Sequence, residues 1–274
     1  MIFQYMGTAA SEGIPAMFCQ CRLCRTAAKN GGKDIRARSG GIINGKVMID
    51  YSPDIYFHKI RFNLDLGNVE ALFFTHSHSD HCAMRQLEFR KLGALCILEE
   101  NRPPLKVFGN EAVGKMFEEE GFNNAGDSLE FTEMKLYQRY EAGNVAVTPM
   151  RATHDLSQTC MIFLIEHKGK RMIYGNDTGY FKDDVFDFLE GKRLDYVSLD
   201  CTSGLGKEGN NHMGLVDCVS IKNELIKRNS ADNSTTFVIT HFAHGGVDVI
   251  HEKLERGASK ENFLVAYDGM TVNI

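Results

Sequence analysis

The sequence lacks the long apolar runs, basic stretches and low-complexity segments that mark several classes of protein. No apolar run approaches the roughly 18–20 residues that a membrane-spanning helix needs. Residues 1–7 lack the basic stretch and the long apolar stretch of a secretory signal peptide. We therefore expect a cytoplasmic protein with no membrane partner.

Positive charge is also scarce. The formal net charge at pH 7 is −5, and the sequence pI is about 6.1. A surface dedicated to nucleic acid usually gathers Lys and Arg, so this balance argues against a nucleic-acid partner. It leaves a small phosphate substrate open, because bound divalent cations can supply the local positive charge.

No repeat or Pro/Ser-rich linker divides the 274 residues. Strand-like runs alternate with helix-like runs, for example a buried strand over 69–74 and helices over 83–92 and 247–254. Asn44-Gly45 and Lys168-Gly169 each separate two strand-like runs and predict hairpins. Early hairpins followed by β-α alternation predict an α/β fold: two mixed sheets packed together, helices outside, in one domain over 1–274.

Eight cysteines in such a chain indicate thiols or metal ligands rather than disulfides. Five lie at apolar or element-edge positions, where we expect small buried hydrophobic residues. They are Cys82, Cys96, Cys160, Cys201 and Cys218.

The other three cysteines, Cys19, Cys21 and Cys24, form a C-x-C-x-x-C cluster in a loop at about 13–30. Thiolates at this density suit tetrahedral zinc, which needs a fourth ligand. His244 could reach this loop if His241, three residues earlier, faces a catalytic cleft. The alternative is a reduced or redox-sensitive loop without metal.

The densest group of metal-binding residue types lies over residues 76–81. Three of the ten histidines of the chain and one Asp fall within these six residues, directly after the expected strand. His76 and His78 alternate and can face one metal, whereas Asp80 and His81 can turn toward a second. Imidazole and carboxylate ligands together suit Zn, Mn or Fe.

Further candidate ligands, His154, Asp177 and His241, each follow a later strand-like run. Loops at one end of a sheet are where a rigid scaffold can gather distant side chains. Taken singly, each histidine could be a hydrogen-bonded residue at a strand edge, and Asp177 could form an Asx turn. Their joint order favours a metal site.

That order, HxHxDH and then His, Asp and His over residues 76–241, resembles the metallo-β-lactamase superfamily. The resemblance implies an αββα sandwich with two divalent metals in the cleft between the sheets. The ligands that it implies for the first metal are His76, His78 and His154. Those for the second metal are Asp80, His81 and His241, with Asp177 bridging the two metals.

The complete ligand set resembles the hydrolase branch that contains phosphodiesterases and tRNase Z, rather than the true lactamases. The cysteine cluster and residues 36–40 resemble the PhnP-type phosphodiesterases of the carbon–phosphorus lyase pathway, in which three Cys and one late His hold a structural Zn. This resemblance implies hydrolysis of a small cyclic or diester phosphate, with a ribose-linked cyclic phosphate as the candidate. It favours Mn in the cleft and Zn in the cysteine site.

Asp80 and His212 are the residues that we expect to act in catalysis. Asp80 would ligate a metal and orient the attacking water. His212 precedes a predicted helix over 215–228, whose N-terminus favours a phosphate, and it matches a further histidine of PhnP-like sites. It would bind phosphate or protonate the leaving alkoxide, unless it is only a solvated histidine at a helix start. Asp50 and Asp200 end strands and would support ligand imidazoles.

Two other functions within the superfamily are alternatives. A tRNase Z-like endonuclease would need a basic arm for tRNA, but the chain has no long Gly/Lys-rich insertion, and the segment from Glu118 to Glu141 is acidic. A PqqB-like member of a cofactor pathway would keep the fold without hydrolysis, and such relatives are expected to lack some ligands. Some superfamily members are dimers, so a homodimer is a further possibility.

Overall fold

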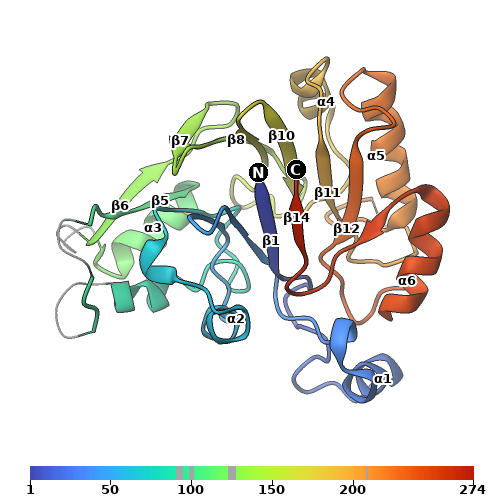
Figure 1. The fold of residues 1–274 in the computed structure, drawn as a ribbon, viewed down its shortest axis with the longest axis horizontal. Coiled ribbons are helices and arrows are strands. Elements are labelled where there is room, and N and C mark those ends of the chain that lie inside the picture. Colours follow the sequence, from blue (N-terminus) through green and yellow to red (C-terminus); the bar gives the residue numbers. More distant parts are fainter. Residues whose placement is uncertain (91–94, 99–101, 123–127, 208) are drawn as a thin grey trace.

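Figure 1 shows the fold of the chain in a computed structural model, which describes residues 1–90, 95–98, 102–122, 128–207 and 209–274. The described strands form two seven-stranded mixed sheets. The first sheet contains, in spatial order, β14 (Thr271–Asn273), β1 (Ile2–Gly7), β2 (Gly40–Ile43), β3 (Val47–Ile49), β4 (Ala71–Phe73), β5 (Leu105–Gly109) and β6 (Leu129–Glu133). The second contains β13 (Leu264–Val265), β12 (Thr236–Thr240), β11 (Tyr196–Asp200), β10 (Lys170–Gly175), β9 (Met161–His167), β8 (Val145–Arg151) and β7 (Tyr140–Ala142).

Apolar side chains fill the space between the two sheets. Phe73 of β4 stacks on Phe108 of β5 with ring centroids 4.4 Å apart, and it meets Phe163 of β9 edge-on at 6.2 Å. Helices α2 (Ile55–Phe62) and α3 (Glu111–Glu119) pack on the outer face of the first sheet. Helices α4 (Asp183–Leu189), α5 (Leu215–Lys227) and α6 (His251–Ala258) cover the outer face of the second. These four layers confirm the predicted αββα sandwich.

Both predicted hairpins are present, and their turns have the expected backbone. Asn44 and Gly45 have φ values of 51° and 68°, and Lys168 and Gly169 have values of 50° and 78°. Two successive residues with positive φ match the right-handed twist of the flanking strands, which is why Asn-Gly is a strong hairpin signal.

Two predicted helices differ from the structure. The segment predicted as a helix over 83–92 contains a 3₁₀-helix, Met84–Arg90, and its expected end lies outside the described residues. The helix predicted over 247–254 begins only at His251 as α6. Asp248 has a φ of 52°, which interrupts the right-handed helical backbone before that point. Apolar spacing predicted helical character but not this local turn.

Four of the five cysteines predicted to be buried are buried, namely Cys82, Cys160, Cys201 and Cys218. The prediction for Cys96 is wrong, because its side chain is only half-buried and lines a cavity described below. None of the helices within the described ranges has the length and apolar character to span a bilayer.

His58 of α2 gives folding a specific pH dependence. Its side chain is buried, and neither ring nitrogen has a hydrogen-bond partner among the described residues. Burial lowers the pKa of His58 to about 4, with nearby Asp54 opposing and Arg61 reinforcing the shift. The unfolded chain binds this proton near pH 6.5, so His58 adds stability that is complete above pH 6.5 and is lost as the pH falls toward 4.

Between pH 7.5 and 5, we expect wild type to lose about 2 kcal/mol more free energy of unfolding than His58→Phe, because the variant has no proton to bind at this position. Urea denaturation of both proteins in the presence of a chelator measures this difference. Identical pH dependence in the two proteins would contradict a neutral, buried His58.

Candidate metal centre and active site

The predicted ligands lie on loops at the same end of the two sheets. Residues 76–81 follow β4, and His154 follows β8. Asp177 and His241 follow β10 and β12. Because β10 and β12 both run parallel to β11, their carboxyl ends meet at one edge of the second sheet. The topology therefore brings together side chains that are up to 165 positions apart in sequence, between residues 76 and 241.

Three buried acidic or histidine residues at this edge have left-handed backbones. Asp50, Asp177 and His241 have φ values of 59°, 48° and 62°. Each comes directly, or within two residues, after a strand. Such conformations are uncommon for residues other than glycine, although Asn, Asp and His adopt them more readily than most. At Asp50, Asp177 and His241 this backbone conformation turns the chain sharply, so that each of these side chains reaches the cleft.

The first predicted ligand group is His76, His78 and His154, whose ligand atoms all lie within 4.8 Å of one another. His154 Nε2 lies 3.2 Å from His78 Nδ1. The rings of His76 and His78 have centroids 4.4 Å apart and are nearly perpendicular. Three imidazole nitrogens thus converge on one point.

The second group contains the remaining predicted ligands, Asp80, His81, Asp177 and His241. Asp177 Oδ2 lies 2.6 Å from His81 Nε2, and its Oδ1 lies 3.2 Å from His241 Nε2. The same Oδ2 lies 3.5 Å from His76 Nε2 in the first group. Asp177 therefore stands between the two groups, where the sequence predicts a bridging ligand.

The chemistry of these donors fits divalent metal ions. The Nε2 atoms of His76, His81 and His241 are buried and face the oxygens of Asp177, but none of them has a contact with hydrogen-bond geometry in the described part of the chain. Burial opposes the charged form of His81, but Asp177, Asp50 and Asp80 raise its pKa well above the usual value. Carboxylates packed this closely require compensating positive charge, which a metal supplies while it binds the orphaned nitrogens.

Two buried carboxylates hold the ligand imidazoles in place, as expected for Asp50 and Asp200. Asp50 Oδ2 lies 2.8 Å from His81 Nδ1, and Asp50 Oδ1 accepts the hydroxyl and backbone N–H of Thr75, each at 2.9 Å. Asp200 Oδ2 lies 3.1 Å from the Nδ1 of His212 and 3.4 Å from that of His241. Such contacts fix the ring and leave the opposite nitrogen for a ligand.

Two supporting residues were missed by the sequence analysis. Asp155 Oδ2 lies 3.3 Å from His78 Nε2, on the side of the ring opposite His154. The hydroxyl of Thr202 lies 2.9 Å from His241 Nδ1 and 3.2 Å from His212 Nδ1. Asp155 had a sequence signal, because it directly follows a predicted ligand. Thr202 had none, since a threonine after a strand is common.

His212 lies in the same cleft as the predicted ligands. Its ring centroid is 4.9 Å from that of His154, and its Nδ1 is 3.4 Å from Asp177 Oδ1. The helix α5 begins at Leu215, three residues later, as the sequence predicts. This position is compatible with either role considered for His212.

The cleft opens to the surface through a small cavity of about 150 Å³. Besides His212 and several predicted ligands, its lining includes Ser11, Glu12 and Ala243. The backbone N–H of His244 donates to Glu12 at 3.1 Å, which ties the first loop to the loop after β12. A carboxylate at the rim was not predicted, because the loop sequence carries no motif for it.

The cysteine cluster and His244 come together as predicted. The predicted loop at about 13–30 is wrong in its second half, because helix α1 (Arg22–Asn30) begins after its N-cap residue Cys21 and contains Cys24. His244 Nδ1 lies 3.3 Å from the sulfur of Cys19 and 3.6 Å from those of Cys21 and Cys24. A tetrahedral zinc with ordinary bond lengths needs sulfur–nitrogen separations of about 3.5 Å. A backbone N–H from Cys24 and the imidazole of His244 lower the pKa of the Cys21 thiol to about 6. The four side chains therefore fit a structural zinc.

A family model described as a β-lactamase superfamily domain matches residues 46–242, more than half of the chain. The chain belongs to this superfamily. It is thus a hydrolase of the metallo-β-lactamase type, as the order of ligands predicts. A curated octanoyltransferase from Porphyromonas gingivalis is 31% identical over 80 residues, which cover 28% of this chain and 15% of the length of the octanoyltransferase.

Several solved structures have the same fold as this chain. A diphosphatase of the PhnP family is 20% identical with a TM-score of 0.76, covering all of this chain and 97% of the other. Zinc-bound PqqB from Methylobacterium extorquens is 18% identical with a TM-score of 0.76 and full coverage of both chains. The short form of human tRNase Z is 14% identical with a TM-score of 0.65, covering 100% and 99%. Identities this low establish the fold alone.

Proposed function

We propose that this superfamily member is a phosphodiesterase that hydrolyses a small cyclic or linear phosphate diester. The observation that carries the proposal is the convergence of all seven predicted ligands and His212 on one cleft with an opening of about 150 Å³. A cavity of this size admits a phosphate group with small substituents, and we choose a small substrate over an RNA. The negative net charge of the chain supports the same choice.

Two divalent metals held by the predicted ligands would supply Lewis-acid activation and would neutralise charge on the phosphate oxygens. His212 of the protein supplies the proton for the leaving group from its Nε2 atom. Its other ring nitrogen, Nδ1, lies 3.1 Å from Asp200 Oδ2 and 3.2 Å from the hydroxyl of Thr202, and these contacts orient the ring. Glu12 at the rim disfavours a dianionic monoester more than a monoanionic diester, because like charges repel. These contacts together favour a diester.

The two alternative functions differ from this proposal in their site rather than in their fold. A non-hydrolytic, PqqB-like role would tolerate loss of ligands, whereas this chain has a residue of the expected type at every ligand position. A tRNase Z-like role would need a basic surface for tRNA. The resemblance to a PhnP-family diphosphatase adds the phosphoanhydride as a second type of bond to test. Each phosphorus of a disubstituted diphosphate carries two substituents, as the phosphorus of a diester does.

The test is hydrolysis by purified protein loaded with Mn or Zn. We expect strong activity on bis-p-nitrophenyl phosphate and weak activity on the p-nitrophenyl monoester. A dinucleoside diphosphate and a precursor tRNA complete the panel and report anhydride and endonuclease activity. If protein with two metals per cleft cleaves the tRNA but not the small diester, or cleaves none of these substrates, the proposed function is wrong.

A further inference from the structure

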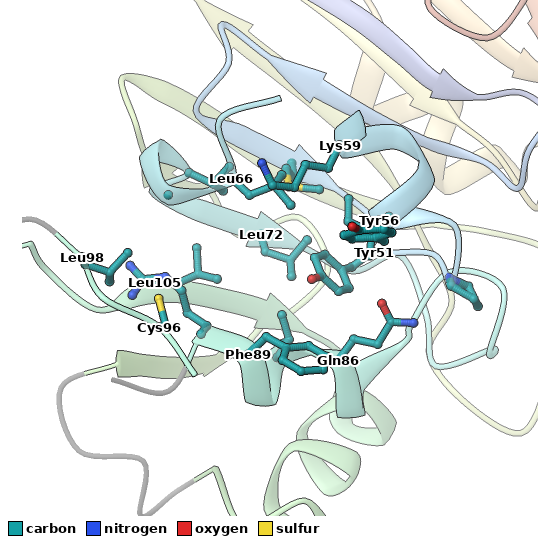
Figure 2. Close-up of a pocket in the computed structure, with 17 residues that line it drawn as sticks. Tyr51, Tyr56, Lys59, Leu66, Leu72, Gln86, Phe89, Cys96, Leu98 and Leu105 are labelled. Atoms are coloured by element: carbon teal, nitrogen blue, oxygen red, sulfur yellow. The ribbon is translucent and has the colours of Figure 1, made fainter. Parts of the chain in front are cut away.

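A second cavity lies on the outer face of the first sheet (Figure 2). It has a volume of about 720 Å³ and is bounded by α2, the 3₁₀-helix Met84–Arg90 and residues 95–98. Its floor and walls are mostly apolar, and include Met48, Ile55, Leu72, Leu87, Leu98 and Leu105. None of the residues that line it also lines the opening of the metal centre.

The charged residues among those described as lining this cavity are of one sign. Lys59 and Arg90 line it, and the described lining residues include no Asp or Glu. The Nε atom of Arg90 is buried, with no hydrogen-bond partner in the described ranges. A buried N–H without an acceptor is unfavourable, and no described residue supplies an acceptor oxygen to Nε of this half-buried side chain.

We infer that this cavity binds an amphipathic carboxylate of the fatty-acid class. The apolar chain would occupy the space over Leu72 and Leu105, which Figure 2 shows on the floor of the cavity, and the carboxylate would lie at Arg90, another lining residue. The volume is typical of pockets for small ligands, which combine an apolar lining with a few polar groups that fix orientation. A guanidinium binds a carboxylate through two parallel hydrogen bonds, which satisfies the buried N–H.

The cavity is close to the metal centre along the chain but separate from it in space. Tyr51 lines the cavity, and its backbone N–H donates to the carbonyl of His81 at 2.7 Å. Its neighbour Asp50 holds the imidazole of His81. Because the two sites share no lining residue, the carboxylate is a second ligand and not the substrate of the metal centre.

A fluorescent fatty acid, dansyl-aminoundecanoic acid, provides the first test with the full chain. We expect saturable binding at one site and displacement by dodecanoate at concentrations at least tenfold lower than by dodecanol, which has the same chain without the charge. The substitution Arg90→Gln should lower the affinity for dodecanoate about tenfold or more, because a charge-assisted contact is lost. The affinity for dodecanol should stay unchanged. Arg85→Gln, an exposed change on the same 3₁₀-helix, is the matched control and should bind like wild type.

A second reporter uses the fact that the chain contains no tryptophan. In Phe89→Trp the single indole lies at the cavity, and its emission should shift as dodecanoate binds. Asp80→Ala should bind dodecanoate normally, which separates this site from the metal centre. Three results would overturn the inference. They are equal affinity for dodecanoate and dodecanol, an equal loss of dodecanoate affinity in the Arg90 and Arg85 variants, and no saturable binding below the micelle concentration.

Discussion

Replacing Asp80 by alanine is expected to lower kcat/KM on a diester by about a thousandfold or more while the fold stays intact. Asp80 Oδ2 lies 3.1 Å from His81 Nε2 within the second ligand group, and its side chain is 12% exposed. The fold should survive, because the carboxylate faces the cleft and not the apolar layers. The loss should come with a lower metal content, since one of the oxygens that compensates for the positive charge is removed.

The measurement combines steady-state kinetics, metal analysis and circular dichroism on the same samples. Ser79→Ala changes the neighbouring, exposed position in the same loop and is the matched control. It should keep both metals and full activity. Full activity in metal-loaded Asp80→Ala would contradict the assignment of Asp80 as a ligand and would remove the basis for the proposed mechanism.

The layers and the ligand groups could be predicted from sequence because they depend on short-range patterns with a clear physical meaning. The apolar run before residue 76 predicted a buried strand, and the loop after a strand places polar side chains at the sheet edge. The histidine and aspartate at positions 154 and 177 follow strands in the same way. The order of ligands then identified the superfamily, which the family model confirms over residues 46–242.

The parts that could not be predicted depend on contacts between distant segments. Glu12 lies at the opening because the N–H of His244 holds it, and no local pattern encodes a pairing across 232 positions. The hydroxyl of Thr202 supports two imidazoles only because β11 and β12 are adjacent. Cys96 was assigned to the core from its apolar surroundings in sequence, yet it lines a cavity together with residues of α2 and the 3₁₀-helix Met84–Arg90, which are distant in sequence or in a separate element.

The cysteine site provides the second large effect: Cys21→Ser is expected to lower the melting temperature by about 10 °C or more. The sulfur of Cys21 accepts the backbone N–H of Cys24 at 3.3 Å and lies 3.6 Å from His244 Nδ1. Structural zinc contributes its binding free energy to folding, so a lost thiolate weakens both together. Zinc content should fall by one equivalent per chain, whereas Cys96→Ser, a control outside the cluster, should keep it.

The rate of diester hydrolysis by Cys21→Ser shows whether the zinc of the cysteine site is structural or catalytic. His244 and His241 share one loop, but His241 is also fixed by contacts of its Nδ1 with Thr202 at 2.9 Å and Asp200 at 3.4 Å. These contacts do not depend on the cysteines, so the folded fraction of Cys21→Ser should hydrolyse a diester at the wild-type rate per cleft metal pair. If that rate falls as steeply as in Asp80→Ala, although the protein is folded and the cleft metals are present, the cysteine site takes part in catalysis and its purely structural assignment is wrong.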